Sequence, residues 1–330
     1  MDSHAGLPFL SVVVPVYNEE QVLPKFLAAM TPVLSQISPD FEIIFAADPC
    51  TDRTFEIIRE AHRSDARIKL LALSRRFGQP AATMAGLAYA RGQVVVVIDC
   101  DLQDPPSLIP EMVKYWRDGN KVVIPQRRSR SGEHPLKKLI AYIGYWFINK
   151  VANVRIPRNT GDFRLLDRRV VNELVKLHES HGFLRGLVAV VGFKTYLLPF
   201  DRDARDAGEG KYNRITGSLR IGFNGIVAFS DYLLSLMVTA GFCISALAVL
   251  GIVIVLVLKL GDMLKWFHWP FESGVPSIMI LILLMGGLQM MSMGILGAYI
   301  GRIYDEAKRR PKFIVEEALG LEEPFDINAN

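Results

Sequence analysis

The stretch from Val94 to Asp104 constrains the fold most strongly. Five β-branched residues, Val94–Ile98, run without alternation into Asp99 and Asp101. Such an unbroken run is typical of a strand buried on both faces, as in a parallel sheet covered by helices. Ligands of open α/β sheets bind beyond the carboxyl ends of the strands. We therefore expect a ligand site at Asp99 and Asp101, where two close carboxylates can hold a divalent cation that bridges a diphosphate.

Asp104 follows in the same stretch and stands directly before Pro105. A helical pattern begins after it, so this acid serves equally well as a helix cap or a solvated loop residue. That explanation fits Asp99 and Asp101 less well, because their two charges would repel each other without a cation or hydrogen-bond donors between them.

Strands and helices alternate through the first part of the chain, which predicts a doubly wound, Rossmann-like α/β domain. Polar residues also follow the first two predicted strands, at Tyr17, Glu19 and Asp48, and parallel strands would bring them to the same rim. No G-x-G-x-x-G follows the first strand and no G-x-x-x-x-G-K-[ST] is present, so the usual NAD site and the P-loop are excluded. The predicted strands cover 10–16, 41–46, 68–73, 94–98, 122–125 and 192–200.

Composition narrows the class of protein further. The net charge is only +4, which gives no signal for a nucleic-acid partner. The three cysteines stand at unrelated spacings, which argues against a disulfide framework or a zinc site. The segment 1–9 lacks the basic and apolar regions of a signal peptide.

Two uncharged segments, Tyr232–Leu258 and Ser273–Gly301, exceed the roughly 20 residues that a transmembrane helix needs. The link 259–272 is rich in aromatic residues and has fewer Lys and Arg residues than the flanking segments. By the positive-inside rule we expect an inner-membrane protein with two helices and both termini in the cytoplasm. Several glycines would let the second helix pack against another copy in a homo-oligomer, namely Gly286, Gly287, Gly294, Gly297 and Gly301.

Two further segments have aromatic and basic flanks or helical apolar spacing. The segment 135–154 predicts a helix in the membrane interface or a buried core helix, and 213–231 predicts an interfacial amphipathic helix. The expected domains are 1–212, 213–231, a two-helix membrane domain at 232–301 and a cytoplasmic tail at 302–330. Four basic residues could hold a phosphate, although a solvated face or contact with anionic lipid heads remains equally open for each: Arg127, Arg202, Arg205 and Lys211.

Together these motifs resemble those of family 2 glycosyltransferases of the GT-A fold, and among them the polyprenyl-phosphate glycosyltransferases. Bactoprenol-phosphate glucosyltransferases and dolichol-phosphate mannose synthases belong to this group. The resemblance covers nearly the whole chain in order. The segments that carry it are Val14–Glu20, Ser74–Gly78, Ala85–Leu87, Asp99–Pro106, Asn159–Leu165, Gly208–Tyr212, Gly301–Tyr304 and Arg309–Pro311.

The resemblance implies a role for each motif on the donor side. The nucleotide-sugar pocket would comprise Pro15, Tyr17, Glu19, Asp48, Gln79, Asp99 and Asp101. Asp101 and Gln103 would be ligands of Mg²⁺ or Mn²⁺, with Asp99 contacting the metal site or the ribose. The chain departs from the family at Ala47, where an acid usually precedes Asp48.

On the acceptor side the resemblance implies Asp162 and Arg164 as the catalytic pair. Asp162 would act either as a base or to position Arg164 or the acceptor. A phosphate monoester loses its second proton at about pH 6, so the acceptor oxygen is already anionic in the cytosol. The implied reaction moves a sugar, glucose from UDP-glucose by preference, to a polyprenyl phosphate such as undecaprenyl phosphate, with inversion.

Other functions stay open at this stage. GDP-mannose or another UDP-sugar could be the donor. A processive polysaccharide synthase would carry Q-x-x-R-W, whereas Gln126 here is followed by Arg127, Arg128 and Ser129. A non-catalytic, membrane-tethered nucleotide-binding partner of a lipid flippase would not need the Gly161–Arg164 motif.

Overall fold

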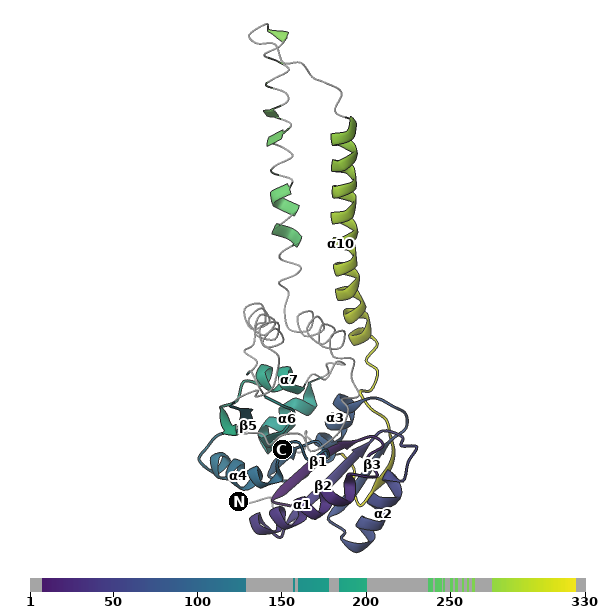
Figure 1. Cartoon of the computed structure of the whole chain (residues 1–330), viewed down its shortest axis with the longest axis vertical. Coiled ribbons are helices and arrows are strands. Elements are labelled where there is room, and N and C mark those ends of the chain that lie inside the picture. The colour runs from purple at the N-terminus through teal and green to yellow at the C-terminus, as the bar shows by residue number, and fades with distance from the viewer. Residues whose placement is uncertain are drawn as a thin grey trace. The chain divides into compact units, whose positions relative to one another are not determined.

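The computed structural model describes residues 8–128, 157, 160–177, 184–200, part of 237–264, and 275–324. The chain divides into two compact units (Figure 1). We call them the sheet domain (Met1–Lys150, Val154–Gly222 and Arg309–Asn330) and the helical unit (Val151–Asn153 and Phe223–Lys308).

Eight strands form one sheet in the sheet domain, in the order β7-β5-β6-β4-β1-β2-β3-β8. Strands β1 to β4 arise from the largely apolar runs that the sequence predicted, and nearly all of their side chains are buried. The strands are β1 Leu10–Val16, β2 Phe41–Ala47, β3 Ile68–Leu73, β4 Val94–Val97, β5 Val122–Arg127, β6 Arg164–Asp167, β7 Thr195–Phe200 and β8 Val315–Leu319.

The sheet is mixed, which corrects the expectation of a parallel sheet. Strand β6 is antiparallel to its neighbours β4 and β5, and β8 is antiparallel to β3. The other pairs, β1 with β2 and β4, β2 with β3, and β5 with β7, are parallel. Sequence patterns predicted neither antiparallel strand. Strand β6 has only Leu165 and Leu166 as apolar residues, and β8 has two consecutive acids, Glu316 and Glu317, at its centre and lies inside the expected tail.

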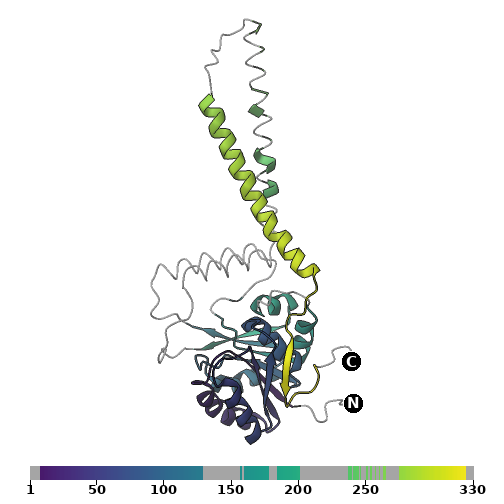
Figure 2. The ribbon, with the colours of Figure 1, turned by 90° about the vertical axis from the view of Figure 1, so that its right-hand side faces the viewer.

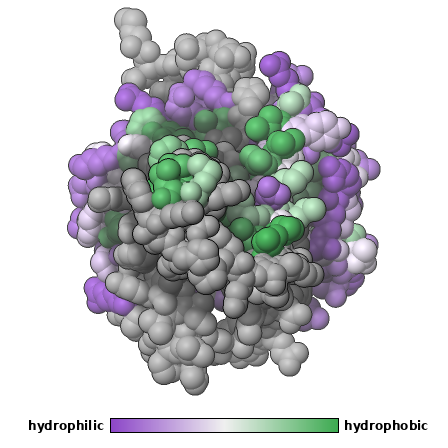
Figure 3. All heavy atoms as spheres, turned by 90° about the horizontal axis from the view of Figure 1, so that it is seen from above, coloured by the Kyte–Doolittle hydropathy of each residue, from purple (hydrophilic) through white to green (hydrophobic). Residues whose placement is uncertain are grey.

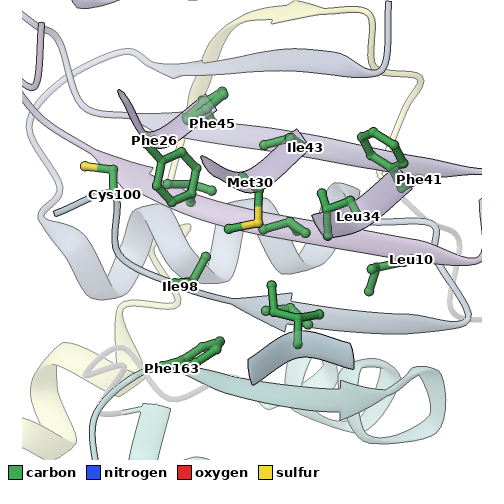
Figure 4. Packing of buried hydrophobic residues seen from close by; sticks show 14 of the residues in the cluster. Leu10, Phe26, Met30, Leu34, Phe41, Ile43, Phe45, Ile98, Cys100 and Phe163 are labelled. Carbon is green, nitrogen blue, oxygen red and sulfur yellow. The ribbon is translucent and has the colours of Figure 1, made fainter. Parts of the chain in front are cut away.

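Helices cover both faces of this sheet. Apolar residues of α1, α2 and α4 pack on one face, and α3 and α6 lie on the other. Figure 4 shows Phe26, Met30 and Leu34 of α1 against strand residues such as Ile43 and Phe45. The helices are α1 Leu23–Ile37, α2 Thr54–Ser64, α3 Gln79–Tyr89, the short 3₁₀ helix η1 Pro106–Leu108, α4 Ile109–Arg117, α6 Arg168–Lys176 and α7 Leu184–Val191.

The C-terminal segment returns to the sheet domain as β8, which lies along the edge strand β3 (Figure 2). The carbonyl of Ile314 accepts the Ser74 N–H at 2.9 Å, and Arg59 donates to Glu317 at 2.6 Å. Arg91 forms an ion pair with Glu322 at 2.5 Å. This strand covers the backbone groups that an open edge would leave unpaired.

The helical unit contains α10, Val275–Ala307. Within the described residues, one stretch, Leu284–Ala307, is long and apolar enough to cross a membrane. Many of its large hydrophobic side chains are exposed, and such residues appear green in Figure 3. The predicted helix Tyr232–Leu258 is described only in part, with helical backbone at the described positions from 237 to 258. The predicted interfacial helices at 135–154 and 213–231 lie outside the described residues.

Candidate active site

The carboxyl ends of β1, β2, β3, β4 and β5 point to one edge of the sheet, which we call the site edge. Because β6 is antiparallel, its amino end lies at this same edge, with Arg164 opposite Val97. A bridge between Thr160 and Gln126 holds the segment before β6 beside the end of β5. This topology brings Gly161 and Asp162 to the rim that carries Asp99, which the predicted parallel sheet did not explain.

The turn after β4 presents the predicted acidic cluster. Gln79, the first residue of α3, donates its side-chain N–H to Asp99 Oδ1 at 2.8 Å. Asp101 is exposed, and its Oδ1 accepts the backbone N–H of Gln103 at 3.1 Å. Between them Leu102 has a φ of 55°, a left-handed conformation that is uncommon for a branched residue. The turn is therefore held in a strained shape that fixes the two acids, a feature that often accompanies function.

The charge on this turn is not balanced. Burial raises the pKa of Asp99 to about 7, with further contributions from the nearby carboxylates of Asp162, Asp101 and Asp104. Within the described residues no group of three His, Cys, Asp or Glu side chains is arranged to hold a metal ion. The donors that are present, the carboxylates of Asp99 and Asp101 and the amide of Gln103, are oxygen ligands of the kind that Mg²⁺ and Mn²⁺ prefer. A cation fits this site because it would offset the repulsion among the acids.

Asp162 forms a tight pair with an arginine that the sequence analysis missed. Arg185, in α7, donates Nε to Asp162 Oδ1 at 2.8 Å and Nη2 to Oδ2 at 3.3 Å. Burial alone would raise the pKa of Asp162, but the hydrogen bonds and charge of Arg185, helped by Arg164, hold the pKa below its usual value. No motif marks Arg185 in the sequence, because a single arginine before a glycine has no characteristic spacing.

Arg164 occupies a different position from the one its motif suggested. Its side chain is only 1% exposed, and it donates to the backbone carbonyls of Gly161 at 2.9 Å, Asp162 at 3.1 Å and Leu184 at 3.5 Å. Burial lowers the pKa of Arg164 to about 10, still well above neutral pH. This arginine therefore fixes the backbone beneath the pair rather than facing a substrate.

Arg127, at the end of β5, lies close to Asp104 and Gly161. Its Nη2 lies 3.4 Å from Oδ1 of Asp104, and Asp104 is buried, which favours the functional interpretation of that acid over a solvated one. The Arg127 Nε is buried with no hydrogen-bond partner in the described part of the chain. A Cβ at Gly161 would lie 3.5 Å from Asp104 and 3.7 Å from Arg127, so the loop passes close to both.

The predicted donor-pocket residues lie at the ends of β1 and β2. Pro15 is buried in β1, and the Arg76 guanidinium lies 4.2 Å from the centre of the Tyr17 ring. The Glu19 N–H donates to Thr54 Oγ1 at 2.9 Å. Asp48 is buried and accepts two backbone hydrogen bonds, from Phe77 at 3.0 Å and Gly78 at 2.9 Å. These two bonds occupy both carboxylate oxygens, so Asp48 braces the loop after β3.

Three predicted phosphate-binding residues, Arg202, Arg205 and Lys211, lie outside the described residues. The remaining predicted site residues all lie at or near the site edge. Asp99, Asp162 and Gln79 come together directly through contacts or charge. Pro15, Tyr17 and Glu19 lie at the end of β1, where Glu19 is near enough to act on Cys100, the residue between Asp99 and Asp101.

Comparison with known proteins identifies the family of this chain. The model of Glycosyl transferase family 2 matches residues 11–175, a range that includes β1 to β6. The chain belongs to this family. Its fold is accordingly a GT-A-like α/β fold with a mixed sheet.

Relatives of this glycosyltransferase match it over nearly its whole length. An uncharacterized glycosyltransferase, YkcC of Bacillus subtilis (strain 168), is 42% identical over 94% of this chain and 94% of its own. A prophage bactoprenol glucosyl transferase homolog of Escherichia coli (strain K12) is 35% identical over 93% of this chain and 98% of its own. The bactoprenol glucosyl transferase of Shigella phage SfII is 35% identical over 94% and 98%. The glycosyltransferase is therefore similar to these proteins well beyond the family domain, which ends at residue 175.

Proposed function

We propose that this glycosyltransferase transfers glucose from UDP-glucose to a polyprenyl phosphate, such as undecaprenyl phosphate, at the cytoplasmic face of the membrane. The observation that carries the proposal is the near full-length similarity to proteins named bactoprenol glucosyl transferase. The acid- and arginine-rich site edge supports the same chemistry, because both substrates are phosphate esters.

On the donor side, Tyr17 and Glu19 would contact the nucleoside. Asp48 fixes the loop that leads to Gln79. Asp101, Asp99 and the Gln103 amide would hold Mg²⁺ or Mn²⁺, whose charge offsets the negative charge that develops on the departing diphosphate. Gln79 orients Asp99 by donating to one of its oxygens.

On the acceptor side, the lipid phosphate supplies the nucleophile. Its second proton is lost at about pH 6, so an anionic oxygen is available near neutral pH without a base. That oxygen attacks the anomeric carbon, the bond from this carbon to the diphosphate oxygen breaks, and the bonding electrons leave with UDP. Attack from the opposite side inverts the configuration of the sugar.

Arginines and a lysine would bind the acceptor phosphate. Arg127 has a buried Nε that finds no partner among the described residues. Strand β7 pairs with β5 up to Phe200 opposite Arg127, and Arg202, Arg205 and Lys211 follow Phe200 in the sequence. Arginine binds phosphate oxygens through paired N–H groups, which suits both the donor and the acceptor.

Two membrane helices would keep the chain at the membrane that holds the lipid phosphate. Strand β8 follows α10 in the chain and pairs with β3, so the segments before and after the helical unit lie on one side of any membrane. An even number of crossings is needed between Phe200 and Val315, which supports Tyr232–Leu258 as a second span beside α10. The termini would then be cytoplasmic, with domains at 1–212, 213–231, 232–301 and 302–330 and with the glycines of α10 available for self-association.

A transfer assay tests the proposal. The purified chain in detergent is given undecaprenyl phosphate, Mg²⁺ or Mn²⁺, and radiolabelled UDP-glucose, UDP-galactose or GDP-mannose in separate reactions. We expect label to move into the organic phase from UDP-glucose, and not in an Asp101→Ala variant that keeps its fold. Transfer only from GDP-mannose or another UDP-sugar would replace the donor, and transfer from none would contradict the proposal.

A further inference from the structure

The Asp162–Arg185 pair combines two features that a surface ion pair lacks. Two separate N–H···O bonds, at 2.8 and 3.3 Å, join the guanidinium to both carboxylate oxygens. The side chains are only 33% exposed for Asp162 and 27% for Arg185. Paired, planar bonds of this kind fix orientation as well as charge.

Arg164 holds the backbone on both sides of this pair. Its guanidinium donates to the carbonyls of Gly161 and Asp162 and to that of Leu184, the residue immediately before Arg185. Arg164 thus connects the loop before β6 to the start of α7. The Arg164 guanidinium is buried and donates to three carbonyls, so it does not face a substrate. The Arg185 side chain remains partly exposed.

We propose that Arg185 is a positioning residue for sugar transfer: by binding both oxygens of Asp162 it fixes that carboxylate beside the acidic turn at Asp99. The inference rests on the proposed function, since it assigns Asp162 to the acceptor side. It also makes Asp162 a poor base for the acceptor proton, because the hydrogen bonds and charge of Arg185 lower the pKa of Asp162.

Among the residues that the structure describes, three charged groups face Asp162 from the elements around it. They are Arg185 from α7, Arg164 from β6 and Asp99 from the turn after β4. When Arg185 is removed, two effects on the pKa of Asp162 remain. Burial raises this pKa, and the charge of Arg164 lowers it. Asp162 would then become protonated at a higher pH than in the wild type, and the rate would fall as the pH is lowered from neutral.

The test compares Arg185→Met and Arg185→Lys with a matched control, Arg67→Met. Arg67 also binds both oxygens of an aspartate, Asp65, at 3.0 and 2.8 Å, but it precedes β3 and so lies at the opposite edge of the sheet. For each variant the rate of transfer is measured across acidic to neutral pH, together with the KM for UDP-glucose and the melting temperature of the full chain.

For Arg185→Met we expect a fall in kcat of about 10- to 100-fold, the value of one charged hydrogen bond of about 1.5–3 kcal/mol. Its KM and melting temperature should match those of Arg67→Met, and its acidic limb should move to higher pH. Arg185→Lys, which keeps the charge but not the paired bonds, should lie between. Wild-type kcat and pH profile in both variants would overturn the role of Arg185.

A second result would also overturn it: an equal loss at every pH that follows a loss of melting temperature, because a structural ion pair alone explains that pattern. Arg185→Lys keeps the test valid if Arg185→Met does not fold. The wild-type chain in the same assay separates the two proposals. Its failure to transfer sugar contradicts the proposed function, whereas wild-type transfer with an unaffected Arg185→Met contradicts only the role of Arg185.

Discussion

Asp48 could either bind the nucleotide directly or shape the pocket by holding a loop, and a substitution distinguishes these two roles. The family resemblance assigns this acid to the donor pocket, but in the structure both of its oxygens accept backbone N–H groups, from Phe77 and Gly78. Gly78 has a φ of 91° and directly precedes α3, whose first residue, Gln79, donates to Asp99. Asp48 therefore fixes the position of Gln79, and Gln79 in turn holds Asp99.

An Asp48→Asn substitution replaces one acceptor oxygen with an NH₂ group that faces a backbone donor. One charged hydrogen bond is lost and the other becomes neutral, which lowers the free energy of unfolding by about 2–4 kcal/mol. For a domain of this size the melting temperature should fall by about 5–10 °C. Affinity for UDP should fall with it, because the loop after β3 is no longer fixed.

Differential scanning fluorimetry of the full chain and a UDP titration measure these two quantities. Asp118→Asn is the matched control, since Asp118 is exposed at the end of α4 and should change neither value. If Asp48→Asn weakened UDP binding while leaving the melting temperature unchanged, Asp48 would be a direct ligand and the bracing role would be wrong.

Three further results are expected. Because the pKa of Asp99 is about 7, Mn²⁺ must displace a proton at lower pH. Mn²⁺ affinity measured by calorimetry with UDP present should therefore rise about tenfold per pH unit up to neutral pH and then level off, and Asp99→Asn should abolish this rise. A Cβ at Gly86 would lie 2.4 Å from Val13 Cγ1, so Gly86→Ala should lower the free energy of unfolding by about 1–3 kcal/mol in a urea titration; no change would mean that β1 and α3 can separate without cost. A chain that ends after Phe313 lacks β8 and exposes the edge of β3, so its melting temperature and UDP affinity should both fall, and wild-type values would contradict a role for this strand.

Local sequence signals were sufficient for the strands that build the core. The runs at β1, β2, β3 and β4 are long, apolar and rich in branched residues, and their burial on both faces follows directly from that pattern. Because parallel strands place their carboxyl ends together, the same pattern was enough to predict the ligand edge and the acids at Asp99 and Asp101.

Strands β6 and β8 could not be predicted in this way, because their places depend on contacts distant in sequence. Strand β6 inserts between β4 and β5, and β8 joins β3 across about 240 residues of chain. Their apolar content is small, and each gains stability from the neighbouring strands rather than from its own propensity.

On the acceptor side, too, single residues have roles that depend on contacts distant in sequence and could not be predicted. The motif identified Asp162 and Arg164, but not which arginine faces the site. That distinction depends on α7, which follows β6 after an intervening helix and brings Arg185 to Asp162 while Arg164 is buried beneath. For Asp48, likewise, the residue type was informative but its two partners in a later loop were not visible in the sequence.

The most direct test of sugar transfer to a lipid phosphate is the identity of both products of a single turnover with UDP-glucose and undecaprenyl phosphate. Mass spectrometry identifies the lipid and the released nucleotide, and NMR gives the configuration of the anomeric carbon. We predict undecaprenyl monophosphate carrying a β-linked glucose, with release of UDP. Release of UMP with a lipid diphosphate sugar, or a product with the α configuration of the donor, would contradict attack on the anomeric carbon with inversion.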